Sequence, residues 1–111
     1  MSDIDVVEKM IALSQKIVSY VKDLDYESFS KNEMIVEACA FNLGQIGELS
    51  HKLTDGFQSA YIDIPWKAIY GMRNKIIHDY DGVNLNVVWE TVSQDLPQLI
   101  EQLKQSIQEG K

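Results

Sequence analysis

The sequence predicts an all-α protein, an up-and-down helical bundle of four main helices plus a short fifth. Two prolines and six glycines in 111 residues leave few places where a helix must break. The alternation of β-branched and aromatic residues that is typical of strands never persists. Apolar residues recur instead at spacings of three and four over four long stretches. We therefore expect a single domain that covers residues 1–111.

The composition is that of an ordinary globular protein, with 45% hydrophobic and 24% charged residues. The N-terminal stretch MSDIDVVEKM has neither a basic leader nor an unbroken apolar run, and no stretch approaches the length of a membrane span. Cys39, the single cysteine, lies among helix formers, where a buried free thiol is expected rather than a disulfide or a zinc ligand. These features predict a cytoplasmic protein that does not enter the membrane.

The formal net charge of -7 opposes broad, nonspecific binding to nucleic acid, because neutralising phosphates needs clustered Lys and Arg. This charge leaves room for a local basic site. Surplus acid on a small domain also favours solubility or a basic partner.

The first helix is predicted from about Ile4 to Leu24, with its end near DLDYESFS. Ser30 followed by Glu33 matches a capping box, in which each side chain satisfies the free backbone N–H of the other residue. The second helix therefore opens there and runs to about Leu53.

In this second helix, Met34, Ala38, Phe41 and Leu49 form the expected apolar pattern. Gly44 and Gly47 remove side chains from one face. A glycine inside a helix costs about 1 kcal/mol, so we interpret the pair as allowing a close neighbour, with ligand contact as the alternative.

His51 has no comparable neighbours in the sequence and is assigned to the surface of the second helix. TDGFQSAYID is expected to be an irregular connector with one short helical turn. Pro65 then suits the first turn of a third long helix, where its missing N–H is not needed, and this helix ends near His78.

Asn84 is expected to cap the last helix, whose apolar pattern from Leu85 to Ile107 is the strongest in the chain. Pro97 interrupts it, because proline cannot donate a hydrogen bond to the carbonyl of Ser93. The helix should kink or restart at this point.

The stretch GMRNKIIHDY, at the end of the third long helix, gathers side chains with chemical potential. Residues four apart on a helix differ by about 40° in direction, so Asn74 and His78 share a face, and Arg73 lies to its side with a stem long enough to reach round. The guanidinium of arginine binds two phosphate oxygens at once, and an amide can orient that phosphate. An imidazole can take up or release a proton near neutral pH. Structural alternatives stay open: His78 as a helix-end residue, Arg73 as an ion-pair partner of Glu48, and Tyr80 as a packing residue.

The string RNKIIHDY has the form R-N-x3-H-x-Y, which resembles the signature of HepT-like toxins within the HEPN superfamily. IGELS, DIPWKAIYGMRN and VVWETVSQDLPQLI resemble that family in the same order, so the likeness spans roughly 38–103. The resemblance implies an all-helical homodimer in which two copies of the motif line one cleft. It also implies a metal-independent ribonuclease without a cofactor. The implied partner is an MNT-type minimal nucleotidyltransferase antitoxin, which transfers AMP from ATP onto the motif tyrosine.

Carried over position by position, the resemblance assigns catalysis to Arg73, Asn74 and His78, and makes Tyr80 the acceptor of AMP. The sequence departs from the family at Asp79, where a small or neutral residue is more usual. A carboxylate beside the histidine favours imidazolium and repels RNA phosphate.

Together with these residues, the resemblance implies an endoribonuclease toxin of a type II or AMPylation-controlled toxin–antitoxin pair, with RNA as its substrate. Glu48 is expected to support the guanidinium of Arg73, and the sequence shows no Asp/Glu/His cluster with the spacing of a metal site. The alternative, which the acidic net charge and Asp79 favour, is a noncatalytic helical module that binds a nucleotide or a partner. A third, purely structural bundle would use His78 only to end a helix.

Overall fold

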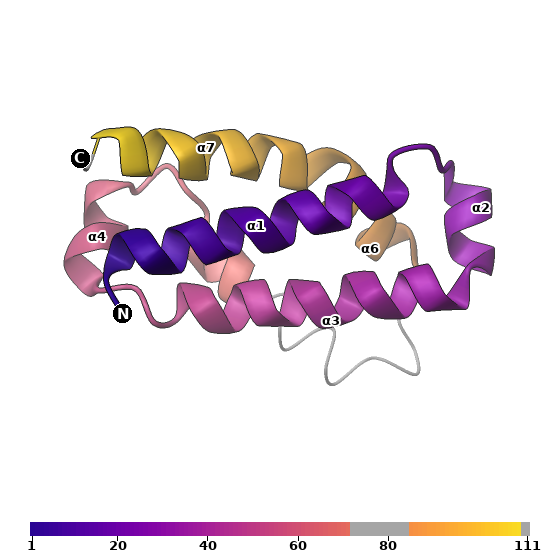
Figure 1. The fold of residues 1–111 in the computed structure, drawn as a ribbon, viewed down its shortest axis with the longest axis horizontal. Helices are drawn as coiled ribbons and strands as arrows, with labels where there is room; N and C mark the ends of the chain where they lie inside the picture. The colour runs from indigo at the N-terminus through magenta and orange to yellow at the C-terminus, as the bar shows by residue number, and fades with distance from the viewer. Residues whose placement is uncertain (72–84, 110–111) are drawn as a thin grey trace.

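The computed structural model describes residues 1–71 and 85–109, and the described part is all-helical without strands, as predicted (Figure 1). Its elements in chain order are α1 (Asp3–Val21), α2 (Tyr26–Lys31), α3 (Glu33–Ser50), α4 (Asp55–Ala60), a helix over 66–71, α6 (Leu85–Glu90), the π-helix η2 (Thr91–Asp95) and α7 (Leu96–Glu109). In Figure 1, α1 lies between α3 and α7 and runs antiparallel to both. This is the arrangement of an up-and-down bundle.

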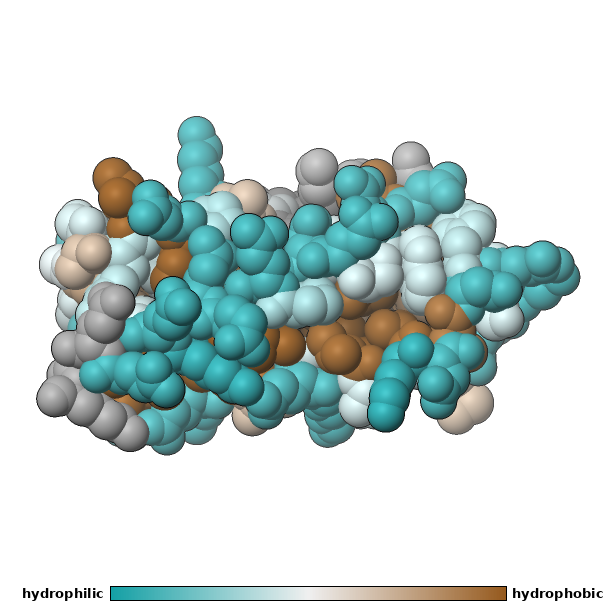
Figure 2. Space-filling view, turned by 90° about the horizontal axis from the view of Figure 1, so that it is seen from above, coloured by the Kyte–Doolittle hydropathy of each residue, from teal (hydrophilic) through white to brown (hydrophobic). Residues whose placement is uncertain are grey.

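The core lies where α1, α3 and α7 meet. All three helices contribute fully buried side chains, among them Met10 and Ile17 of α1, Leu43 and Ile46 of α3, and Leu103 of α7. Each such side chain contributes about 1.5–3 kcal/mol through the removal of apolar surface from water. Viewed from the side of α7, the surface is largely hydrophilic, and apolar side chains show in separate patches between the hydrophilic ones (Figure 2).

Helix α1 begins with a capping box that the sequence pattern at its start permits. The Ser2 hydroxyl accepts from the Asp5 amide at 3.1 Å, and the Ser2 amide donates to the Asp5 carboxylate at 3.4 Å. The carboxylate of Asp3 also accepts two hydrogen bonds from Thr54, from its amide at 3.0 Å and from its hydroxyl at 2.7 Å. The N-terminus of α1 is thereby fixed to the N-cap of α4.

The predicted capping box of Ser30 and Glu33 is wrong. Ser30 lies inside α2, where its hydroxyl donates to the Glu27 carbonyl at 3.0 Å. Helix α3 is capped instead by Asn32, whose side-chain oxygen accepts from the Ile35 amide at 3.1 Å. Asn32 is both the C-cap of α2 and the N-cap of α3, so Ser30, two residues earlier, is part of α2 and cannot cap α3.

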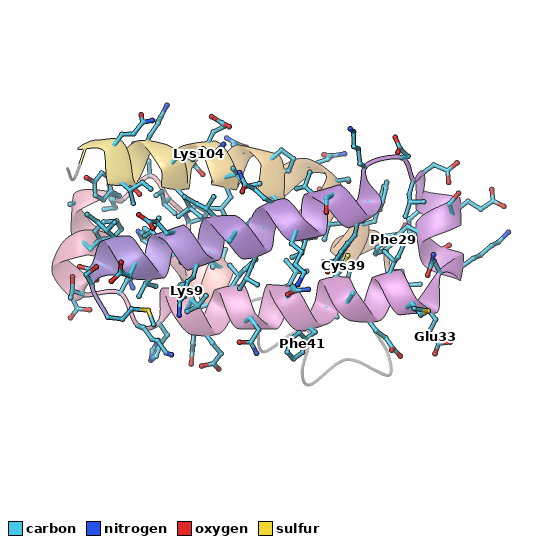
Figure 3. The ribbon with its side chains drawn as sticks, in the orientation of Figure 1. Lys9, Phe29, Glu33, Cys39, Phe41 and Lys104 are labelled. Carbon is cyan, nitrogen blue, oxygen red and sulfur yellow. The ribbon has the colours of Figure 1, made fainter. Side chains whose placement is uncertain are left out.

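The predicted apolar face of α3 is also wrong in part. Met34 and Phe41 are 81% and 67% exposed, and Figure 3 shows Phe41 pointing away from the bundle. The buried face is formed by Cys39, Leu43 and Ile46, which follow the same spacing of three and four one position further round. Both sets of residues have the spacing of one helix face, and packing against α1 determines that the set with Cys39, Leu43 and Ile46 is the buried one.

Two smaller predictions about α3 have different outcomes. Cys39 is a buried free thiol, as expected, and burial raises its pKa to about 11. A Cβ added to Gly44 would meet no heavy atom of the described residues within 4 Å, so the close neighbour expected at this glycine is not found among them.

Pro97 has the predicted effect on the last helix. The backbone changes from α6 to the π-helix η2 and then restarts as α7 at Leu96, whose amide donates to the carbonyl of Thr91. The wider turn therefore stands directly before the residue that cannot donate. Within 1–71 and 85–109, no helix has the length and apolar character needed to cross a bilayer.

Candidate active site

The helix over 66–71 leads into the stretch that carries the predicted catalytic residues. Pro65 stands one residue before the helical backbone, and its carbonyl accepts the Ile69 amide at 3.0 Å. Ile69 is buried in the core, so the helix has one fixed face. The prediction for Pro65 is confirmed to within one residue, since Pro65 immediately precedes the first helical residue and its carbonyl accepts the first bond of the helix.

Trp66 anchors the start of this helix to α4. Its indole N–H lies 3.2 Å from the Gln58 carbonyl and 3.1 Å from the Tyr61 carbonyl, and its ring meets the ring of Phe57 edge-on at 6.1 Å. The last carbonyls of a helix have no partner within the helix, and the indole helps to satisfy two of them. Trp66 therefore helps to fix the connector between α4 and the helix.

His51 and Tyr70 join the end of α3 to the end of the described part of this helix. Their rings stack with centroids 4.4 Å apart and an interplanar angle of 24°. The assignment of His51 to the surface is confirmed, since its side chain is exposed at the C-cap of α3. Its contact with Tyr70 joins two helices, and the neighbouring residues in the sequence do not predict such a contact.

The predicted catalytic and modification residues all belong to the stretch 72–84, which lies outside the described residues. This holds for Arg73, Asn74, His78, Asp79 and Tyr80, and also for the predicted cap Asn84. Glu48 is described and half-buried near the end of α3, but its pairing with Arg73 involves a residue outside the described part. The roles of all these side chains stay predictions.

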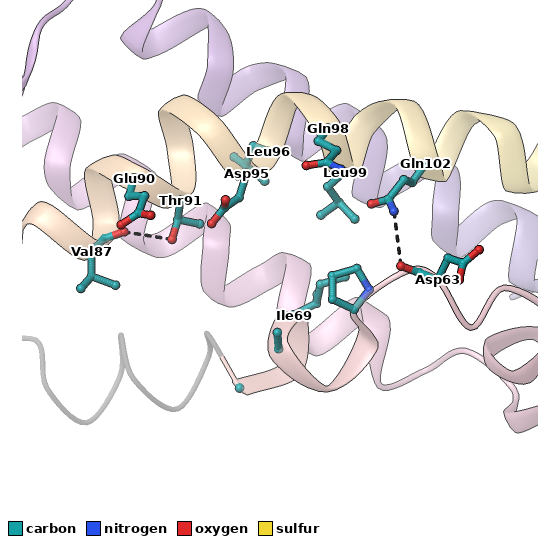
Figure 4. A pocket seen from close by; sticks show the side chains of 13 residues that line it. Asp63, Ile69, Val87, Glu90, Thr91, Asp95, Leu96, Gln98, Leu99 and Gln102 are labelled. Atoms are coloured by element: carbon teal, nitrogen blue, oxygen red, sulfur yellow. Dashed lines mark hydrogen bonds between the residues drawn. The ribbon is translucent and has the colours of Figure 1, made fainter.

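A cleft opens beside the last described turn before this stretch, between the helix over 66–71 and the continuous wall of α6, η2 and α7 (Figure 4). It has a volume of about 610 Å³ and reaches from Asp63 to Gly71 on one side and from Val87 to Gln102 on the other. The amide of Gln102 donates to the Asp63 carbonyl at 3.3 Å and joins the two walls. We call this cleft the acidic groove, after the carboxylates of Asp63, Glu90 and Asp95 that line it.

The described residues offer little other chemistry. No three His, Cys, Asp or Glu side chains among them are grouped so as to hold a metal ion. The Cys39 thiol stays protonated near neutral pH, since burial raises its pKa to about 11, and a thiol is a poor nucleophile. The acidic groove forms only when separate helices pack together, so no pattern in the sequence predicts it.

Comparisons with known proteins identify the family. The family described as "Ribonuclease HepT-like" matches residues 10–106, a region that includes RNKIIHDY. The chain is 34% identical to "Putative RNase TTE0752" of Caldanaerobacter subterraneus subsp. tengcongensis over 105 residues, which cover 95% of this chain and 94% of that protein. It is 32% identical to "Probable ribonuclease HepT" of Thermococcus cleftensis over 95 residues, or 86% of each chain. No solved structure gives a significant match. The chain therefore belongs to the HepT-like ribonuclease family.

Proposed function

We propose that the protein is an endoribonuclease that cleaves RNA without a metal ion, using Arg73, Asn74 and His78. The observation that carries this proposal is the family match over residues 10–106, which contains the motif R-N-x3-H-x-Y at 73–80. The two relatives have names that describe them as ribonucleases, and the chain matches each of them over most of its length.

In the proposed mechanism, the ribose 2′-oxygen attacks the neighbouring phosphorus while the bond from phosphorus to the 5′-oxygen breaks. His78 takes the proton from the 2′-OH or supplies one to the leaving 5′-oxygen. Arg73 holds the scissile phosphate and stabilises the charge that grows on its oxygens, and Asn74 orients the phosphate or the histidine. Glu48 supports the guanidinium from α3.

Catalysis by these residues requires that the helix leading into them is held in place, and the described structure supports this requirement. The helix over 66–71 is fixed by the buried Ile69, by the two hydrogen bonds of Trp66 and by the stacking of Tyr70 on His51. Side chains on elements held by packing and hydrogen bonds are positioned more accurately than side chains on free loops.

The test is cleavage of a mixed RNA pool in EDTA by the parent protein, His78→Ala and Arg73→Ala, with the intact mass of each protein recorded. The matched control is Lys16→Ala, which removes an exposed cation from α1 and leaves the contacts of the helix over 66–71 intact. We expect cleavage to fall by about 10²-fold or more in both site variants and to persist in the control. Equal cleavage by all four proteins would refute the mechanism. An unmodified parent that binds nucleotide but cleaves nothing would favour the noncatalytic binding module.

We further propose that the protein acts as a cytoplasmic toxin and that an MNT-type nucleotidyltransferase neutralises it, by forming a complex, by transferring AMP to Tyr80, or by both. An AMP group there would obstruct RNA through its bulk and its negative charge. Incubation with the cognate transferase and ATP should add the mass of one AMP to the parent and none to Tyr80→Phe. A mass gain that survives this substitution would place the modification elsewhere.

The proposed active form is a homodimer, in which acid and base come from different chains. The exposed apolar side chains of Met34 and Phe41 on α3 support this proposal, because a second copy would remove them from water. Sedimentation of Phe41→Ser tests the proposed dimer. Ile62→Ser is the control, because it also removes an exposed apolar side chain. We expect the dimer to dissociate only in Phe41→Ser, and equal sedimentation would show that the interface lies elsewhere.

A further inference from the structure

The acidic groove combines an apolar floor with a charged rim. Ile69, Leu96 and Leu99 line it and are 2%, 1% and 6% exposed, so they form the wall of the core as well as the floor of the groove. The carboxylates of Asp63, Glu90 and Asp95 stand above them and are exposed. A ligand that fits both surfaces must itself be partly apolar and partly charged.

The charge of the groove is unbalanced. Among the described residues that line it, three are acidic and none is Lys, Arg or His. Within 1–71 and 85–109, the side chains of Asp63, Glu90 and Asp95 form no ion pair. Unpaired carboxylates along a cleft attract cations and repel phosphates. The groove therefore fits a basic ligand and disfavours RNA or an anionic lipid surface.

The spacing of the carboxylates shows what kind of cation fits. In Figure 4, Asp63 lies at one end beside Gln102, Glu90 at the other end beside Val87, and Asp95 between them. The described residues contain no cluster of three acidic or other ligating side chains that would hold a metal ion. Separated charges above an apolar floor match a chain with several basic side chains and apolar ones between them. The volume of about 610 Å³ is large enough for several side chains.

Both walls of the groove are fixed by hydrogen bonds. Gln102 donates across it to the Asp63 carbonyl at 3.3 Å, and the Thr91 hydroxyl donates to the Val87 carbonyl at 2.9 Å (Figure 4). The π-helix η2 places Thr91 and Asp95 on the same wall. A preformed groove loses little conformational entropy when a segment docks.

We propose that the acidic groove is a docking site for a basic, amphipathic segment of another protein. The segment places Lys or Arg side chains on Asp63, Glu90 and Asp95, and its apolar side chains on Ile69 and Leu99. This inference depends on the groove alone and is independent of RNA cleavage.

The probe for this site is a short fluorescein-labelled peptide in which Lys and Leu follow a helical pattern, compared with a peptide in which Glu replaces each Lys. Fluorescence anisotropy measures binding to the full chain and to Asp63→Asn/Glu90→Gln/Asp95→Asn. The matched control, Glu8→Gln/Asp23→Asn/Glu101→Gln, removes the same charge from exposed acids outside the groove. A further variant, Ala68→Lys, puts a cation into the groove at an exposed helical position. Circular dichroism checks that all variants are folded.

We expect the Lys peptide to bind the parent and the control alike, and the groove variant about tenfold more weakly, since three exposed ion pairs are lost. Ala68→Lys should weaken binding to a similar degree, and the Glu peptide should not bind. RNA cleavage, measured in parallel, should be the same in all variants. Equal binding to the groove variant and the control would overturn the proposal. Dissociation of a parent dimer by the groove substitutions would also overturn it, because the groove would then be an interface between copies.

Discussion

At the scale of the residue, Cys39 shows how burial controls reactivity. Its thiol is fully buried on the face of α3 that packs into the core (Figure 3). Desolvation disfavours the thiolate, and the pKa rises above its ordinary value of 9.0 to about 11. The residue is therefore a packing residue in the folded protein and becomes reactive only when the chain opens.

This shift makes stability depend on pH in one direction. The folded pKa is the higher one, so the contribution of the thiol is complete below pH 9 and is lost as the pH rises toward 11. Urea unfolding of the parent and Cys39→Ala should show a difference in free energy that is constant below pH 9. Between pH 9 and 11 the parent should lose up to about 2 kcal/mol relative to the variant. Parallel pH profiles for the two proteins would contradict this expectation.

At the scale of the element, helix ends depend on single side chains. Asn32 caps α3 through its bond to the Ile35 amide, whereas Ser30 only bonds back to the carbonyl of Glu27 within α2. Asn32→Ala should destabilise the protein by about 1 kcal/mol, because the first turn of α3 loses its acceptor. Ser30→Ala should change stability by less than about 0.5 kcal/mol. Urea denaturation of both variants decides between the observed cap and the one that the sequence suggests.

The open space beside Gly44 gives a second expectation for α3. The residue lies inside a helix, and within 1–71 and 85–109 an added Cβ would meet no heavy atom within 4 Å. Gly44→Ala should therefore raise the free energy of unfolding by about 0.5–1 kcal/mol, since alanine loses less backbone entropy in a helix. Gly56→Ala, which is equally open but lies in the first turn of the short helix α4, should gain less. A loss of stability in Gly44→Ala would mean that the glycine serves a contact.

At the scale of the whole molecule, α1 connects the bundle by packing against both α3 and α7. We therefore propose that 1–111 folds as one domain and unfolds in one cooperative step. The two tryptophans report on different regions, Trp66 beside α4 and Trp89 against Phe29 of α2. Fluorescence of Trp66→Phe and of Trp89→Phe should each give the same urea midpoint as circular dichroism of the same variant. Separate midpoints within one variant would indicate two independently folding parts.

Periodicity and proline chemistry were enough to predict the all-helical bundle and the interruption before Pro97. They did not predict α2, because a helix of six residues is shorter than the window over which apolar spacing can be recognised. They also could not choose between the two apolar stripes of α3, since only packing against α1 does so. The stacking of His51 on Tyr70 and the acidic groove depend on elements that meet only in the folded chain.

The π-helix η2 also sets the rotational phase between α6 and α7. A π-turn holds one residue more than an α-turn, and each residue turns an α-helix by about 100°. If 91–95 had regular α geometry with no residue removed, α6 would be rotated by about that angle relative to α7. Val88, now in the core, and Glu90, now on the groove, could not both keep their places. The wider turn absorbs the extra residue and thus lets one continuous wall serve the core and the groove at once.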